Sequence, residues 1–298
     1  MQTNANIKPH LTLLVANIIY GLNYTIAKDV MPEYISPFGF IFCRVTGALL
    51  LFWLVFSFSY EKVAKKDLLL LAVCGLFGVA ANQLMFFHGL NLTTPINAGI
   101  IMTSNPIFVL IASAIILKNR ITILKIGGIL IAITGALLLL LFKKDFSFGS
   151  ETISGDIFIF LNALSYGTYL VLAVPLMQKY KPLTVITWVF TFGFIYVFPF
   201  GIEQFTQIEW STFTSTIWWE FAFVIIGTTF FAYLLNIYGL KNLSPTTVST
   251  YIYLQPLLAA SFAIWTGKDN LDWIKIVAAI LIFSGVYLVS KRKTLKTQ

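Results

Sequence analysis

The sequence predicts an all-α integral membrane protein with ten transmembrane helices in two inverted five-helix repeats, both termini being cytoplasmic. Three observations support this: the composition, the length of the apolar runs, and a set of landmarks that occurs twice. Hydrophobic residues make up 58% of the chain and charged residues only 11%, whereas a soluble domain has about 25% charged residues. A chain with so few charges is expected to fold in lipid.

The apolar runs are each close to the roughly 20 residues that a helix needs to cross about 30 Å of hydrocarbon. Every run is bounded by polar residues, Gly or Pro, which separate it from the next. The predicted spans are residues 11–29, 36–58, 68–89, 95–117, 121–142, 153–177, 183–202, 217–239, 245–266 and 271–290.

Lysine and arginine are distributed unequally between alternate loops. Fourteen lie on the side of the two termini, and five lie on the other side, namely Lys28, Lys143, Lys144, Lys268 and Lys275. Cytoplasmic loops carry the excess of these residues, so both termini are predicted to face the cytoplasm. The predicted location is the inner (plasma) membrane of a bacterium, which the chain crosses several times. The net charge of +8 then reflects topology and not nucleic-acid binding. The basic tail, 291–298, is interpreted as a topology anchor, with lipid headgroup recognition as the alternative.

The landmarks of the first half recur in the second half at an offset of 150 residues. Pro106 corresponds to Pro256, Gly89 to Gly239 and Gly135 to Gly285. The prediction is a first repeat at 11–142, a polar linker at 143–152 and a second repeat at 153–290. Because five spans is an odd number, the second repeat enters the membrane from the opposite side, which makes the two repeats inverted.

The first two spans each carry polar residues that need an explanation. Asn17, Tyr20 and Tyr24 share one face of the first span, and in hydrocarbon such a face must turn toward protein or water. Whether it lines a pore or holds helices together is left open. Arg44, well inside the second span, is interpreted as a charge contact, either to substrate or to a counter-charge. The alternative is that its side chain extends outward to the membrane surface.

The third span brings Asn82 onto the face of two glycines, which suits close helix approach with an amide available for hydrogen bonding. In the fourth span, Asn97 and Asn105 share a face, and Pro106 leaves the carbonyl of Met102 without its helical partner. An unpaired carbonyl in hydrocarbon must be satisfied by protein, water or substrate.

The ninth span repeats this arrangement, since Pro256 follows Gln255, and Gln255 shares a face with Tyr251. Interrupted helices at corresponding positions of two halves indicate a substrate site near the middle of the membrane. Pro106 and Pro256 are therefore predicted conformational hinges, with static kinks as the alternative.

The sixth and seventh spans add aromatic candidates, because Tyr166-Gly167 matches Tyr20-Gly21 and Trp188 follows in the seventh. Asn162, Asn236 and Trp265 are further candidates for the lumen. The predicted substrate-binding residues are Tyr20, Asn82, Asn97, Asn105, Tyr166, Trp188, Tyr251 and Gln255.

Several kinds of chemistry have no signal in the sequence. No Asp or Glu lies deep inside a predicted span, and no phosphate-binding glycine loop, metal-ligand cluster or nucleophile–base pair is found. Cys43 and Cys74 both fall inside spans and are expected to be buried apolar side chains. We therefore expect a protein that is not an enzyme and uses no cofactor or metal.

The chain resembles the EamA family of the drug/metabolite transporter superfamily over about residues 11–290. The matching residues are Tyr20-Gly21, Pro37, Arg44, Gly89-Leu90, Pro106, Gly135, Gly239-Leu240, Pro256 and Gly285. The family's Gly-Glu pair is replaced here by Lys118-Asn119 and Lys268-Asp269. The resemblance implies a basket of helices round a central cavity, with the fifth and tenth helices packed outside it, and transport of small metabolites.

The sequence thus predicts a secondary transporter or facilitator of small organic solutes, amino acids or related metabolites, that exports them by alternating access. An aromatic cavity with amides suits such solutes. The alternatives are an importer of a vitamin or nucleobase, or a non-transporting receptor or lipid scramblase. The expected partners are a small-molecule substrate and membrane lipid; coupling and oligomeric state are left open.

Overall fold

The computed structural model describes residues 7–141, 153–265 and 273–290, all of whose regular elements are helical. The predicted linker at 143–152 and the basic tail at 291–298 lie outside these residues. Seven helices in the described part are long and apolar enough to cross a membrane. They coincide with seven predicted spans. The spans predicted at 11–29, 121–142 and 245–266 fall outside that set, so the count of ten remains a prediction.

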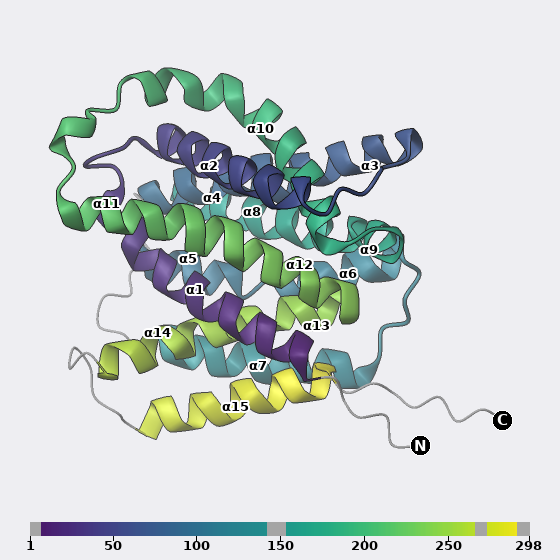
Figure 1. The fold of residues 1–298 in the computed structure, drawn as a ribbon. Helices are drawn as coiled ribbons and strands as arrows, with labels where there is room; N and C mark the ends of the chain where they lie inside the picture. Colours follow the sequence, from purple (N-terminus) through teal and green to yellow (C-terminus); the bar gives the residue numbers. More distant parts are fainter. Residues whose placement is uncertain (1–6, 142–152, 266–272, 291–298) are drawn as a thin grey trace.

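The elements of the first half run from α1, in purple, to α7, in teal (Figure 1). They are α1 (Lys8–Val30), α2 (Pro37–Ser57), α3 (Lys65–Gly75), the π-helical turn η1 (Leu76–Ala80), α4 (Ala81–Leu92), α5 (Pro95–Met102), α6 (Asn105–Ile116) and α7 (Ile123–Leu141).

The second half has a similar order of elements. They are α8 (Ile153–Leu172), α9 (Val174–Lys179), α10 (Pro182–Thr206), the 3₁₀ turn η3 (Trp210–Thr212), α11 (Ser215–Ala222), the π-helical turn η4 (Phe223–Phe231), α12 (Ala232–Asn242), α13 (Pro245–Thr250), the 3₁₀ turn η5 (Tyr251–Tyr253), α14 (Leu254–Trp265) and α15 (Trp273–Ser290).

The helices α5 and α13 begin in the same way, with a hydroxyl residue at the N-cap and proline in the first turn. The Thr94 hydroxyl oxygen accepts a hydrogen bond from the Asn97 N–H (3.1 Å), and Ser244 accepts one from the Thr247 N–H (3.2 Å). Such a cap satisfies an N–H that the helix leaves unpaired, and proline costs little at this position.

Two kinds of interruption occur at matching places in the two halves. The π turn η1, shifted by 150 residues, falls within η4. The helix also breaks at Thr103–Ser104, between α5 and α6, and changes to a 3₁₀ turn at Tyr251–Tyr253, between α13 and α14. This correspondence is what a duplicated unit would give, and the inverted arrangement of the two units remains a prediction.

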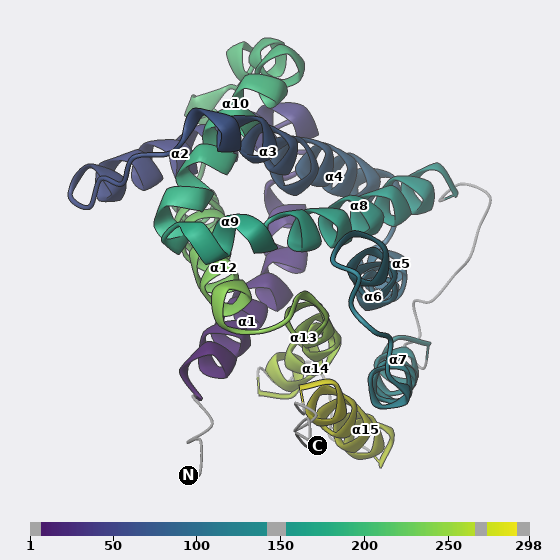
Figure 2. The ribbon, with the colours of Figure 1, turned by 90° about the vertical axis from the view of Figure 1, so that its right-hand side faces the viewer.

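The helices α7 and α15 pack against each other at one side of the molecule, where α14 also contacts both of them (Figures 1 and 2). A Cβ added at Gly285 would lie 2.5 Å from the carbonyl oxygen of Gly128, and one at Gly135 would lie 2.8 Å from that of Ala278. Neither position has room for a larger residue, so glycine allows the two backbones to approach closely.

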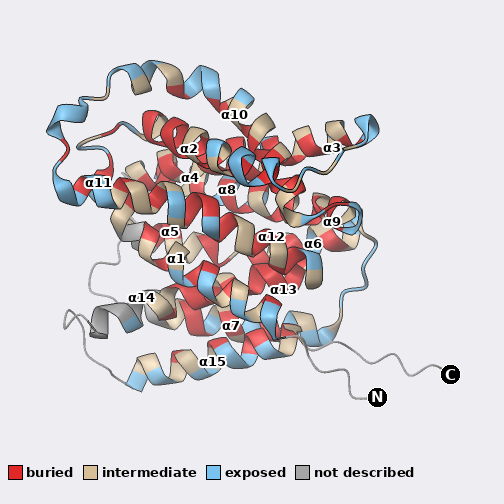
Figure 3. Cartoon of the chain, in the orientation of Figure 1, coloured by how far each residue is buried: buried red, intermediate tan, exposed pale blue. Residues whose placement is uncertain are grey.

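Figure 3 shows where the buried and exposed residues lie. Many large apolar side chains are exposed on the exterior of the bundle, whereas polar side chains are found among the buried residues. Leu50 on α2, Ile115 on α6 and Phe283 on α15 are 66%, 72% and 56% exposed. Meanwhile Asn105 and Thr229 are completely buried. This distribution is expected of a protein whose surroundings are lipid tails.

Candidate functional site

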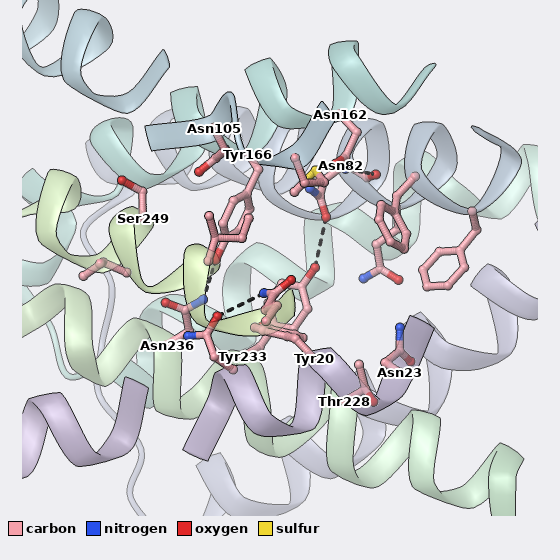
Figure 4. Close-up of a pocket in the computed structure, with 18 of the residues that line it drawn as sticks. Tyr20, Asn23, Asn82, Asn105, Asn162, Tyr166, Thr228, Tyr233, Asn236 and Ser249 are labelled. Carbon is pink, nitrogen blue, oxygen red and sulfur yellow. Dashed lines mark hydrogen bonds between the residues drawn. The ribbon is translucent and has the colours of Figure 1, made fainter. Parts of the chain in front are cut away.

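A cavity of about 100 Å³ lies between the two halves of the chain (Figure 4). Its wall is built mainly of carboxamide side chains, tyrosines and apolar side chains. The lining residues are Asn17, Tyr20, Asn23, Arg44, Asn82, Gln83, Phe86, Phe87, Met102, Asn105, Asn162, Tyr166, Thr228, Tyr233, Asn236, Val248, Ser249, Ile252 and Gln255. No residue of α7 or α15 belongs to this wall, in agreement with the expectation that these helices pack outside it.

Tyrosines from three helices point into the cavity and bond to amides (Figure 4). The Tyr233 hydroxyl on α12 donates a hydrogen bond to Oδ1 of Asn82 on α4 (3.1 Å), and Asn236 donates through Nδ2 to the hydroxyl of Tyr166 on α8. The Tyr20 and Tyr233 rings meet edge to face, with centroids 6.3 Å apart. The aromatic wall is thereby held in one arrangement by a polar contact between the halves, from Tyr233 to Asn82, and by one within the second half, from Asn236 to Tyr166.

Two amides at the wall use their nitrogens on backbone carbonyls. Asn105 donates through Nδ2 to the carbonyl of Ala163 (2.7 Å), and Asn162 donates through Nδ2 to the carbonyl of Asn82 (2.7 Å). Because only the NH₂ group of a carboxamide can donate to a carbonyl, these bonds fix which side of each amide is the oxygen. Both Oδ1 atoms are buried without a partner in the described part of the chain, so two carboxamides of the wall have an acceptor that the protein leaves unsatisfied.

A third amide bond joins the second helix interruption to α1. Gln255 donates through Nε2 to Oδ1 of Asn17 (3.0 Å), and Asn17 donates through Nδ2 to the carbonyl of Leu13 in its own helix (2.8 Å). Pro106 and Pro256 follow Asn105 and Gln255 directly and stand at the start of α6 and α14. Their role as hinges remains a prediction.

The Arg44 side chain is buried, at 2% exposure, and does not extend to the outer surface. It donates through Nε to the Thr229 hydroxyl (3.0 Å), which in turn donates to the Val224 carbonyl (2.7 Å) in the π turn η4. The guanidinium lies 4.2 Å from the ring centroid of Phe87 and 5.7 Å from that of Phe40. Cation–π contacts of this kind are worth roughly 2 kcal/mol when desolvated.

The structure brings some of the predicted site residues into the cavity and places others elsewhere. Tyr20, Arg44, Asn82, Asn105, Tyr166 and Gln255 line it, as do the further candidates Asn162 and Asn236. The wall does not contain Asn97, Trp188 or Tyr251. The side chain of Trp265 lies outside the described residues.

The interruptions explain the placement of Tyr251 and Asn97. Tyr251 and Gln255 would share a face of a continuous α-helix, but the 3₁₀ turn η5 changes the rotation between them, and the Tyr251 hydroxyl meets Nδ1 of His10 (2.6 Å). Asn97 is separated from Asn105 by the break at Thr103–Ser104 and is fully buried. The spacing of two residues in the sequence predicts that they share a helix face only where the helix between them is regular.

Trp188 faces a different neighbour. Its ring packs edge to face on Trp53, with centroids 5.8 Å apart, and Trp53 is 36% exposed. Both tryptophans belong to the α2–α10 contact and not to the cavity. A single tryptophan inside an apolar span carries no signal for which side of the helix faces protein.

Several lining residues lack a clear signal in the sequence, notably Asn23, Gln83, Thr228 and Tyr233. Tyr233 lies three residues before Asn236 and shares its face, a spacing that could have indicated it. Gln83 is adjacent to Asn82, yet both line the cavity, beside Phe86 and Phe87. The π turn η1 just before them alters the helical rotation, and nothing in the residue types of 76–80 predicts it.

Metal ligands do not gather in the part of the chain that the structure describes. No group of three or more His, Cys, Asp or Glu side chains there could hold a metal ion. Cys43 and Cys74 are buried free cysteines. The wall therefore offers binding through hydrogen bonds, aromatic contacts and one buried cation.

Comparison with known proteins identifies the family. The model of the EamA-like transporter family matches the chain twice, over residues 7–141 and 153–291. An uncharacterized transporter of Archaeoglobus fulgidus is 27% identical over 290 residues, covering 97% of this chain and 99% of that protein. The uncharacterized transporter YyaM of Bacillus subtilis is 26% identical, covering 94% of this chain and 93% of its own.

More distant matches cover the chain as fully. A WAT1-related protein of Arabidopsis thaliana is 24% identical over 309 residues, covering 94% of this chain and 82% of that protein. A solved crystal structure shares the fold, with a TM-score of 0.76 at 16% identity, covering 95% of this chain and 96% of the other. These names indicate a multi-pass membrane transporter and not an enzyme. The chain belongs to the EamA-like transporter family, within the drug/metabolite transporter superfamily.

Proposed function

We propose that this protein is a secondary transporter or facilitator of small organic solutes, such as amino acids or related metabolites, and that it exports them across a bacterial inner membrane. The observation that carries the proposal is the central cavity, whose wall combines residues of both halves with both helix interruptions. Membership of the family supports transport in general. The amides, tyrosines and apolar residues of the wall support a small, partly polar solute.

Alternating access requires contacts between the halves that can break and re-form. Two candidates are the hydrogen bonds of Asn105 to Ala163 and of Gln255 to Asn17, which join residues 58 and 238 positions apart. Each begins at the amide that precedes a repeat proline. We infer that these two bonds are remade as the cavity changes the side of the membrane to which it opens, with Pro106 and Pro256 as hinges.

Flux through proteoliposomes tests the proposal. A panel of labelled amino acids and small metabolites is offered to vesicles that contain the purified protein, with and without an imposed proton gradient. We expect flux of a subset that Asn105→Ala and Gln255→Ala each abolish. Asn119→Ala, which changes an exposed amide beyond the end of α6, is the matched control and should leave the flux unchanged.

Other outcomes of the same vesicles separate the rival functions. Movement of a labelled lipid between leaflets, with no solute flux, would favour a scramblase. Absence of both activities would favour a receptor. Comparing inside-out with right-side-out membrane vesicles gives the direction, since an exporter accumulates solute in inside-out vesicles when a driving force is imposed.

A further inference from the structure

Arg44 is the single charged side chain among the residues that line the cavity. The wall contains no Asp or Glu. The salt bridge found in the described part of the chain joins Lys179 to Asp67 and involves no cavity residue. Arg44 thus carries a full positive charge at a buried wall without a protein anion beside it.

The contacts of Arg44 orient it and leave donors free. Its Nε bonds to the Thr229 hydroxyl (3.0 Å), whose own proton is directed to the Val224 carbonyl. The Phe87 ring covers one face of the guanidinium, at 4.2 Å. Its Nη1 is buried and has no partner among the described residues. The stacked face and the bonded Nε leave the outer N–H groups for a ligand.

A buried guanidinium of this kind is not stabilised by the protein alone. Burying a charge costs far more than a cation–π contact and one hydrogen bond to a hydroxyl recover. Charged residues inside a membrane are therefore retained where they pair with something. In this cavity the missing partner is an anion, and guanidinium N–H groups match the geometry of a carboxylate.

The rest of the wall limits the anion to one charge and adds further contacts. A dianion such as a phosphate monoester would bring a second negative charge that no other lining residue balances. Asn105 and Asn162 bring to the wall carboxamides whose Oδ1 atoms have no partner among the described residues, and Tyr20, Tyr166 and Phe86 provide apolar surface.

We propose that Arg44 binds the carboxylate of the solute, and that the cavity takes small organic monoanions with an apolar body. The proposal rests on the proposed function, because it treats the ligand of this cavity as the transported solute. It makes Arg44 the residue that separates acids from neutral analogues of the same size.

Binding to the purified full-length protein in detergent tests the proposal without transport. The probes are phenylacetate against phenylacetamide and isovalerate against isovaleramide, each pair matched in size and differing in charge. Titration monitored by thermal unfolding should show stabilisation by the acids and none by the amides. Arg44→Gln should weaken binding of the acids roughly 10- to 100-fold, the range for a hydrogen bond to a charged group.

Two further variants separate binding from structure. Arg44→Lys keeps the charge but loses the planar fork, so an intermediate affinity is expected. Lys66→Gln removes an exposed charge on α3 and should change nothing. Without any ligand, Arg44→Gln should unfold at a temperature no lower than the unaltered protein, since it removes an uncompensated buried charge.

The proposal is overturned if acids and amides stabilise equally, if no acid stabilises, or if Arg44→Gln binds acids unchanged. A lower unfolding temperature of unliganded Arg44→Gln would also overturn it, because Arg44 would then be a structural residue. Acids that bind through Arg44 but do not cross liposomes would leave the anion site standing and refute transport. Flux of neutral solutes that is unchanged by Arg44→Gln would support transport and refute the anion site.

Discussion

Gln255 donates a hydrogen bond from Nε2 to Oδ1 of Asn17, 3.0 Å away, and so ties the second helix interruption to the first helix of the other half. The bond from Asn105 Nδ2 to the Ala163 carbonyl (2.7 Å) ties the first helix interruption to α8, the first helix of the second half. Each amide precedes a proline. The two contacts link the interruptions to the opposite half of the molecule.

The Gln255–Asn17 bond gives a first prediction about stability. Gln255→Leu should lower the free energy of unfolding by about 1–3 kcal/mol, because it leaves the buried Asn17 Oδ1 without a partner. The double variant Asn17→Leu/Gln255→Leu should recover part of that loss, since no orphaned polar atom remains. Chemical unfolding in detergent measures both. A double variant that merely sums the two single losses would show that the bond is not the source of the effect.

The close contact of α7 with α15 gives a second prediction. In Gly285→Ala the new Cβ would meet the Gly128 carbonyl oxygen at 2.5 Å, so the helices must move apart, at a cost of about 1–3 kcal/mol. Gly127→Ala is the control, because nothing lies within 4 Å of its Cβ position. It should be neutral or stabilising by up to about 1 kcal/mol. Equal unfolding temperatures for the two variants would contradict the packing argument.

Much of this fold could be predicted from the sequence, because the signals are long or repeated. A run of about 20 apolar residues specifies a span almost irrespective of its neighbours, and seven predicted spans coincide with long apolar helices in the described part of the chain. The positions of the helix breaks could also be predicted from the sequence. A proline preceded by an amide at Asn105 and at Gln255 marks them directly.

The cavity lining was predictable only in part, because the irregular turns decide which side chains of a helix point into the cavity. Tyr20, Asn105 and Tyr166 lie in regular helix and line the wall as predicted. Tyr251 falls in the 3₁₀ turn η5 and is turned away. The π turns η1 and η4 carry no residue signal, so the joint presence of Asn82 and Gln83 at the wall could not be foreseen.

A cluster at one end of the bundle gives a third prediction. The Tyr180 hydroxyl donates to Oδ2 of Asp67 (2.7 Å) and accepts from the Ala64 N–H (3.1 Å), while Lys179 Nζ lies 2.8 Å from Oδ1 of the same carboxylate. Tyr180→Phe removes two of these contacts and leaves their partners poorly satisfied. The free energy of unfolding should fall by about 1–2 kcal/mol.

Tyr60→Phe is the control for that cluster, since Tyr60 is 68% exposed. Its unfolding temperature should equal that of the unaltered protein. Asp67→Asn should resemble Tyr180→Phe, because the neutral amide loses the charge-assisted bond to Lys179. If Tyr180→Phe were as stable as Tyr60→Phe, the hydroxyl would not stabilise this end of the bundle.

The repeat prolines give the last prediction, which concerns flux. Alanine at position 106 or 256 restores an N–H that can continue the helix across the interruption. Flux should fall by about tenfold or more in each variant, equivalent to about 1.4 kcal/mol against the conformations in which the helix is broken. Pro199→Ala is the control, because Pro199 lies exposed inside α10, away from the cavity. It should raise stability and leave flux unchanged.

The two prolines should not be equivalent. In the first half, the hydroxyls of Thr103 and Ser104 donate to the carbonyls of Ile100 (2.5 Å) and Ile101 (2.7 Å), which supports the break without proline. In the second half, the hydroxyls of Ser249 and Thr250 donate to the Thr246 carbonyl (3.0 and 2.6 Å) before the turn begins, whereas no residue of Tyr251–Tyr253 itself donates to a carbonyl among the described side-chain contacts. Pro256→Ala should therefore reduce flux more than Pro106→Ala, and Pro106→Ala combined with Thr103→Val should close the gap. Equal, unreduced flux in every proline variant would identify both interruptions as static kinks.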